Sequence, residues 1–123
     1  MTTQKKALAV LEDLFFTVKI NESAKRAGLP IEFLKSEIDA LTKAKEAPSV
    51  ILLDLNYAAI NPLHLIAQLK ASPETKSVPL IGYVSHVQGE LKRQAQAAGC
   101  DMVLARSAFS QNLLQILKRH SGA

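Results

Sequence analysis

The chain has a single cysteine and no tryptophan among its 123 residues, and only 5% of its residues are aromatic. One thiol, Cys100, cannot form a disulfide within the chain, so the disulfide-stabilised class of small secreted domains is excluded. The N-terminal sequence MTTQKKALAV also lacks the apolar stretch and small-residue cleavage site of a signal peptide. We therefore expect a cytoplasmic protein.

Long hydrophobic runs and blocks of like charge are also absent. No window approaches the roughly 18 uninterrupted apolar residues of a membrane span. Fifteen basic residues against eleven acidic ones give a net charge of +4, but the basic residues are dispersed along the chain. We expect no membrane and no nucleic acid among the partners.

The apolar share of 48% and the charged share of 21% are typical of a globular protein. The length is that of one domain, so we expect a single domain over residues 1–123 with no output domain.

Short apolar runs alternate with longer segments in which apolar residues recur every three or four positions. This alternation predicts repeated strand–helix units and hence an α/β fold with a parallel sheet. Five units of this size favour the flavodoxin-like, doubly wound sheet with strand order 2-1-3-4-5 and helices on both faces. The predicted strands are residues 7–11, 30–34, 50–55, 78–84 and 101–105.

The helices between these strands carry recognisable ends. Gly28 is expected to end the first helix, and the pair Asn61 and Pro62 to begin the third. Ser107 or Ser110 is the predicted cap of the last helix, and residues 88–98 form the predicted fourth helix. The residues expected on inward helix faces include Leu14, Phe15, Val18, Ile38, Leu41 and Ala44. Phe16 and Cys100 are expected in the core.

The third predicted strand, in the stretch VILLDLN, runs from aliphatic residues directly into Asp54. Its lack of polar alternation indicates that both faces are covered. In such sheets ligands bind beyond the carboxyl ends of the strands, where the strand order reverses, here between the first and third strands. Glu12 and Asp13 end the first strand, so we expect three carboxylates to converge there. Their repulsion calls for a cation, and oxygen ligands of this kind suit Mg²⁺.

Two further polar residues follow the remaining strands. Ser85 ends the fourth strand and Arg106 ends the fifth, which places a hydroxyl group and a positive charge at the same rim. Carboxylates, a cation, a hydroxyl and a guanidinium together indicate a phosphoryl-binding site. A plainer interpretation is that Asp54 only caps a turn. The histidines His64, His86 and His120 lack the spacing of zinc ligands, and only His86 is placed to cover the crevice.

This ordered set resembles the receiver domain of two-component response regulators, over essentially the whole chain. The resemblance implies that Asp54 is the phospho-acceptor, that Ser85 and Arg106 take the places of the family's hydroxyl residue and lysine, and that Mg²⁺ is held by Glu12, Asp13, Asp54 and the backbone carbonyl of Asn56. It also implies phosphorelay signalling, in which a histidine kinase or phosphotransfer protein supplies the phosphate. A downstream protein of unknown identity would bind the face formed by helix four, strand five and helix five. A homodimer is a further candidate. The protein would not be an enzyme beyond its own phosphorylation and dephosphorylation.

The sequence also departs from the family pattern. Arg106 replaces a lysine, Ser107 stands where a proline is usual, and Val103 lies near the usual position of an aromatic residue. A planar guanidinium does not reproduce a compact ammonium. These differences favour an alternative, a pseudo-receiver that binds proteins without being phosphorylated. A hydrolase or flavin protein on the same fold is a third, more distant interpretation.

Overall fold

The computed structural model describes residues 5–85 and 89–121. Its centre is one sheet of five parallel strands in the order β2-β1-β3-β4-β5, as the sequence predicts. The predicted edge position of the second strand is therefore confirmed. The strands are β1 (Ala7–Val10), β2 (Ile31–Leu34), β3 (Val50–Asp54), β4 (Leu80–Val84) and β5 (Met102–Ala105).

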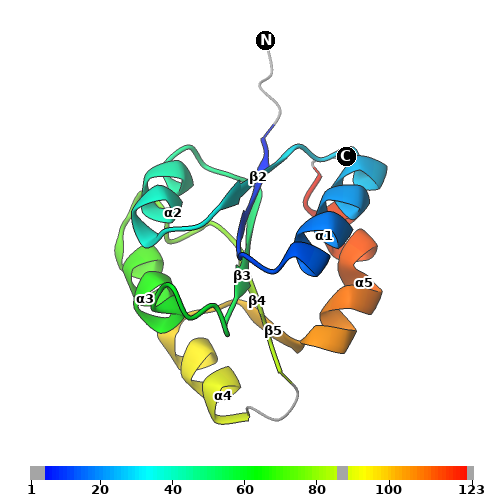
Figure 1. Ribbon diagram of the computed structural model, residues 1–123. Coiled ribbons are helices and arrows are strands. Elements are labelled where there is room, and N and C mark those ends of the chain that lie inside the picture. The colour runs from blue at the N-terminus through cyan, green and yellow to red at the C-terminus, as the bar shows by residue number, and fades with distance from the viewer. Residues whose placement is uncertain (1–4, 86–88, 122–123) are drawn as a thin grey trace.

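In the described ranges, five helices cover the two faces of the sheet. Helices α1 and α5 lie on one face, and α2, α3 and α4 lie on the other (Figure 1). This is the predicted flavodoxin-like fold. In the described part of the chain, no helix is long and apolar enough to cross a membrane. The helices are α1 (Leu14–Ala27), α2 (Glu37–Ala44), α3 (Pro62–Ala71), α4 (Gly89–Ala98) and α5 (Arg106–Arg119).

The central strands β3 and β4 are buried along their whole length. Because successive side chains of a strand point to opposite faces, each of these strands contributes side chains to two separate hydrophobic cores. Leu53 packs into the core under α2, α3 and α4, whereas its neighbour Leu52 packs under α1 and α5. The same alternation carries the side chain of Asp54, two residues after Leu52, to the α1/α5 face.

Two of the predicted helix ends are confirmed. Gly28 ends α1 in the left-handed conformation, with φ of 71°, which favours glycine. Asn61 caps α3 by accepting a hydrogen bond from the backbone N–H of His64 at 3.1 Å, and Pro62 is the first helical residue.

The predicted serine cap of α5 is wrong. The helix begins at Arg106, directly after β5, and its N-cap residue Ala105 makes no side-chain hydrogen bond. Ser107 and Ser110 therefore lie inside the helix. Burial of Phe109 against the sheet, rather than a capping side chain, positions this helix start.

The predicted inward faces of α1 and α2 are wrong in part. Both sequences carry two apolar stripes, and tertiary packing chooses between them. In α1 the inward stripe is Phe16, Ile20 and Ala24, whereas Leu14, Phe15 and Val18 are 75%, 67% and 50% exposed. In α2 Ala40 and Ala44 are inward and Leu41 is partly buried against the same core, whereas Ile38 is 75% exposed. The predicted core positions of Phe16 and Cys100 are confirmed.

Candidate functional site

Asp54 is the last residue of β3, and only 7% of its surface is exposed. Its Oδ1 accepts a hydrogen bond from the backbone N–H of Asn56 at 2.8 Å. Burial raises the pKa of Asp54 above its usual value, and this effect outweighs the opposing influence of the Asn56 N–H and the Arg106 charge. The charge of Asp13 adds to the rise. Asp54 is thus a buried carboxylate within electrostatic reach of one negatively charged side chain, Asp13, and one positively charged side chain, Arg106.

Asp13 is the N-cap of α1 and pairs with Arg106 at the start of α5. Its Oδ1 caps the helix by accepting from the Phe16 N–H at 3.2 Å, and its Oδ2 accepts from the Arg106 guanidinium at 2.9 Å. Burial alone would raise the pKa of Asp13, but Arg106 and the helix N–H groups together lower it below its usual value. The structure therefore brings Asp13, Asp54 and Arg106 to one place.

Arg106 is held from two directions. Besides its bond to Asp13, its guanidinium carbon lies 4.7 Å from the centre of the Phe16 ring, a cation–π arrangement. Its charge lowers the pKa of Asp54, but in the described part of the chain its hydrogen bond goes to Asp13. Arg106 thus connects the starts of α1 and α5 above the buried aspartate.

Glu12 does not join this group. It is exposed, and its charge contributes to the raised pKa of Tyr57, whose burial is the larger cause. Tyr57 belongs to the core under α2, α3 and α4. Among the described residues, Glu12, Asp13 and Asp54 do not form a group of three metal-binding side chains, and of the two acids after β1 only Asp13 affects the pKa of Asp54. The predicted cluster of three carboxylates is reduced to two.

The Asn56 side chain has a role that the sequence did not indicate. Its Oδ1 accepts a hydrogen bond from the backbone N–H of Ser85 at 3.1 Å, which ties the loop after β3 to the end of β4. The backbone of Ser85 therefore lies next to the Asn56 side chain, and the predicted role of the Ser85 hydroxyl stays a prediction. The predicted metal contact of the Asn56 carbonyl stays a prediction. His86, the residue expected to cover the crevice, lies outside the described residues.

Beneath the charged groups lies a stack of aromatic rings. The ring centre of Tyr83 is 4.5 Å from that of Phe109 and 5.0 Å from that of Phe16. Tyr83 is fully buried, and within the described residues its hydroxyl has no hydrogen-bond partner. A buried, unpaired polar group of this kind costs about 1–3 kcal/mol of stability. Sequence reasoning missed Tyr83 because VPLIGYV is a plain apolar strand pattern; the one signal was a hydroxyl-bearing residue two positions before Ser85.

The oxygen donors of this site are of the kind that Mg²⁺ prefers. Among residues 5–85 and 89–121, however, no three acidic, histidine or cysteine side chains lie close enough together to form a metal-binding group. Mg²⁺ commonly takes only one or two carboxylates together with water, so Asp13 and Asp54 are a fitting pair. A cation would compete with Arg106 for the Oδ2 atom of Asp13.

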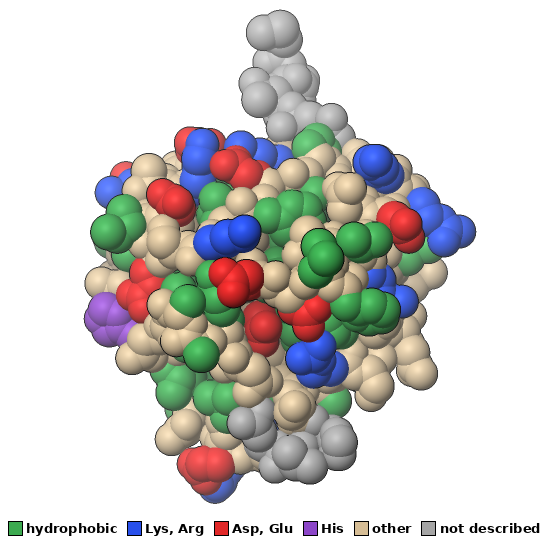
Figure 2. All heavy atoms as spheres, viewed as in Figure 1, with side chains coloured by type: hydrophobic (Ala, Val, Ile, Leu, Met, Phe, Trp, Pro, Cys, Tyr) green, Lys and Arg blue, Asp and Glu red, His purple; other side chains and the backbone are tan. Residues whose placement is uncertain are grey.

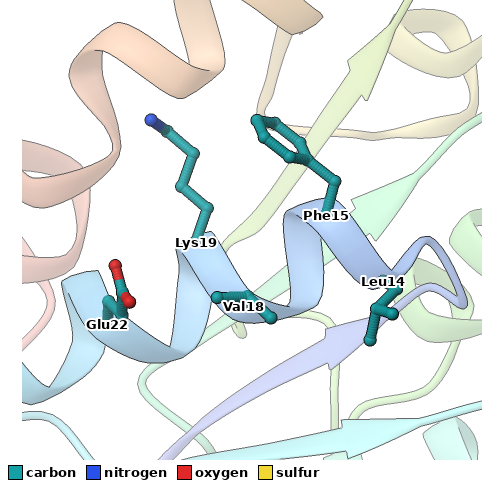
Figure 3. Close-up of a pocket in the computed structure, with 5 residues that line it drawn as sticks. All are labelled: Leu14, Phe15, Val18, Lys19 and Glu22. Atoms are coloured by element: carbon teal, nitrogen blue, oxygen red, sulfur yellow. The ribbon is translucent and has the colours of Figure 1, made fainter.

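The site lies beside an exposed apolar surface. Figure 2 shows acidic and basic side chains side by side near the centre of one face, with hydrophobic side chains next to them. The surface of α1 has a shallow depression of about 520 Å³, lined by Leu14, Phe15, Val18, Lys19 and Glu22. In Figure 3 Phe15 and Lys19 project to one side of α1, and Leu14 and Val18 to the other. These residues form an uncovered strip on the helix that Asp13 caps.

Comparison with solved structures identifies the fold. The chain is similar to the chemotaxis response regulator CheY4 of Vibrio cholerae, with 24% identity, a TM-score of 0.80, and coverage of 96% of this chain and 99% of that one. A response regulator from Hahella chejuensis has 19% identity and a TM-score of 0.84, with coverage of 97% and 96% respectively. The receiver domain of the sensor histidine kinase PA1611 from Pseudomonas aeruginosa, described with a magnesium ion in its active-site cleft, has 19% identity and a TM-score of 0.81, with coverage of 98% and 100%.

No protein-family model matches the chain, and no curated protein sequence matches it. The predicted resemblance to receiver domains is confirmed at the level of the fold, which covers nearly the whole chain.

Proposed function

We propose that the chain is a receiver-type signalling domain in which Asp54 accepts a phosphoryl group from a histidine kinase or a phosphotransfer protein. The observation that carries this proposal is the position of Asp54: it ends β3 of a receiver fold, buried beside Asp13 and Arg106. Ligands of such folds bind at this edge of the sheet. An aspartate that only caps a turn would need neither Asp13 nor Arg106 beside it.

In the proposed reaction, the carboxylate of Asp54 attacks the phosphorus of a phosphohistidine. The nitrogen–phosphorus bond breaks, its electron pair stays on the imidazole, and an acyl phosphate forms on Asp54. The Asn56 N–H holds Oδ1, which leaves Oδ2 as the attacking oxygen. Arg106 lowers the pKa of Asp54 and so favours the ionised, nucleophilic form.

Bound Mg²⁺, held by Asp13 and Asp54, would supply positive charge to the oxygens of the transferring group. The backbone N–H of Ser85 is bonded to Asn56, and in this proposal the Ser85 hydroxyl would donate a hydrogen bond to the product. We propose that the phosphorylated form signals through the face made by α4, β5 and α5, to a downstream protein or a second copy of the chain. A cytoplasmic location fits histidine-kinase partners and the single free cysteine, Cys100.

A phosphorylation-independent binding module is the second candidate. It is favoured by the Asp13–Arg106 ion pair, which already occupies the acid that would hold the cation. In this case the Asp13–Arg106 ion pair stays intact, and the domain binds its partner without any chemical change at Asp54.

Intact-mass measurement after incubation with Mg²⁺ and acetyl phosphate tests the first candidate. We expect the wild-type protein to gain the mass of one phosphoryl group, and Asp54→Asn to gain none. Asp39→Asn is the matched control, because Asp39 is an exposed aspartate of α2, which covers the opposite face of the sheet from α1 and α5. A wild-type protein that gains no mass would contradict phosphoryl transfer. If Arg106→Lys then restored the gain, the guanidinium would be identified as the cause, and the second candidate would stand for the natural chain.

A further inference from the structure

Within the part of the chain that the structure describes, the Tyr83 hydroxyl is a buried donor without an acceptor. The whole side chain has no exposed surface, and among the described residues the hydroxyl makes no hydrogen bond. Nearly all buried polar groups in proteins are paired, so an unpaired one calls for a specific explanation. A phenylalanine would fill the same space without this unpaired group, so packing alone does not account for a tyrosine.

The position of Tyr83 connects it to the candidate site. In the register of the sheet, Tyr83 of β4 lies directly opposite Asp54 of β3. Both side chains point to the α1/α5 face, where the charges of Asp54, Arg106 and Asp13 all act on the hydroxyl. The ring is stacked on Phe109 and packed against Phe16, so it is held in place beneath the charged groups.

Three of the nearby carboxylate oxygens are already engaged. The Oδ1 atom of Asp54 accepts from the Asn56 N–H, and the two carboxylate oxygens of Asp13 accept from Phe16 and Arg106. A phosphoryl group on Asp54 would bring three new acceptor oxygens into this surrounding. A neutral hydroxyl suits such a group, because it donates a hydrogen bond without adding a charge that must itself be neutralised.

We propose that Tyr83 donates a hydrogen bond from inside the core to the phosphoryl group carried by Asp54, and that it thereby stabilises the phosphorylated state. This inference rests on the proposed function. It adds to Ser85 and Arg106 a third polar contact, one that approaches from the sheet rather than from the solvent side. Tyr83 is then a phosphoryl-binding residue that is unpaired only while Asp54 is unmodified.

Beryllofluoride, which bonds to an aspartate oxygen and mimics a phosphoryl group, provides the test. Its affinity in the presence of Mg²⁺ is measured by calorimetry for the wild-type protein and for Tyr83→Phe, together with the thermal shift that it causes. We expect Tyr83→Phe to bind about tenfold more weakly, the effect of losing one hydrogen bond to a charged group. Without ligand, we expect this variant to be at least as stable as the wild-type protein, because it removes an unpaired hydroxyl.

Tyr57→Phe is the matched control. The Tyr57 hydroxyl already donates to the backbone carbonyl of Lys35 at 3.0 Å, on the other face of the sheet. We expect this variant to lose stability and to keep the beryllofluoride affinity of the wild-type protein.

The outcomes separate the two proposals. Equal affinity of the wild-type protein and Tyr83→Phe would overturn the role of Tyr83 and leave phosphorylation of Asp54 intact. A less stable Tyr83→Phe protein without ligand would also overturn it, because the hydroxyl would then have had a partner. No binding by the wild-type protein would overturn the proposed function itself, and the role of Tyr83 with it.

Discussion

At the scale of single residues, the site contrasts two neighbouring carboxylates. The pKa of Asp54 is raised, chiefly by burial, and that of Asp13 is lowered, because Arg106 and the N–H groups at the start of α1 outweigh its burial. A raised pKa means that the ionised form is disfavoured in the folded state. The stabilising contribution of Asp54 is therefore present below its unfolded pKa and is lost as the pH rises through its folded pKa. The contribution of Asp13 has the opposite dependence.

We predict that Asp54→Asn stabilises the protein at neutral pH. The amide oxygen keeps the hydrogen bond from Asn56, and the cost of burying a negative charge disappears. The expected gain in the free energy of unfolding is about 1 kcal/mol at pH 7, falling to near zero in acid, where Asp54 is protonated in both states. Urea unfolding followed by circular dichroism across this pH range measures it.

Asp13→Asn is the control with the reverse sign. The Asp13→Asn variant should be less stable than the wild-type protein at neutral pH and nearly as stable in acid. The expected difference is modest, because the Asp13–Arg106 pair is about one-third exposed. An Asp54→Asn protein that is less stable than wild type at pH 7 would show that the burial of this carboxylate is not the dominant effect.

These residues also show how far the sequence predicts the site. The positions of Asp13, Asp54, Ser85 and Arg106 follow from one rule, that the ends of parallel strands meet at one edge of the sheet. The rule does not give side-chain direction, so Glu12 was expected inside the site and lies outside it. It also does not reveal which apolar-looking strand residue points a hydroxyl beneath the acid, and Tyr83 was missed for that reason.

At the scale of elements, α1 shows why helix faces are harder to predict than helices. Its sequence LFFTVKINESAKRA contains two apolar stripes, and periodicity alone cannot rank them. Phe16 is chosen because its ring fits against Tyr83 and Phe109 and under the Arg106 guanidinium. The unchosen stripe remains at the surface as the strip around Phe15 and Val18.

We predict that two adjacent phenylalanines of α1 differ sharply in their effect on stability. Phe16→Ala removes a buried ring and should cost about 3–5 kcal/mol, whereas Phe15→Ala removes an exposed ring and should change the free energy of unfolding by less than about 1 kcal/mol. Urea unfolding of the two variants, which differ by one helical position, measures this contrast directly. Similar losses in both would mean that α1 is rotated from the described orientation.

At the scale of the whole molecule, the fold was predicted more completely than its parts. Five apolar runs alternating with helical segments allow few right-handed arrangements, and the observed order 2-1-3-4-5 is the one expected for this size. Local errors, such as the cap of α5 or the face of α2, did not affect this result. Chain topology depends on the sequence of strand and helix types, whereas caps and faces depend on the fit of particular side chains.

One sheet separates two cores, and we predict that both nevertheless unfold in a single transition, the usual behaviour of a chain of this size. Leu65→Ala opens the core under α2, α3 and α4, and Leu113→Ala opens the core under α1 and α5. Each substitution should lower the free energy of unfolding by about 2–5 kcal/mol and leave the slope of this free energy against urea concentration unchanged. The strands belong to both cores, so neither face can lose its packing while the other keeps an intact sheet.

The two tyrosines of the chain make this prediction measurable, since there is no tryptophan to obscure them. Tyr83→Phe leaves Tyr57 as a fluorescent reporter of one core, and Tyr57→Phe leaves Tyr83 as a reporter of the other. We expect the fluorescence transition of each variant to coincide with its own transition by circular dichroism, with and without the leucine substitutions. A reporter whose transition separates from that of the backbone would show that one face opens independently. A change at Asp54 could then loosen the α1/α5 face without being transmitted to α4 on the other face of the sheet.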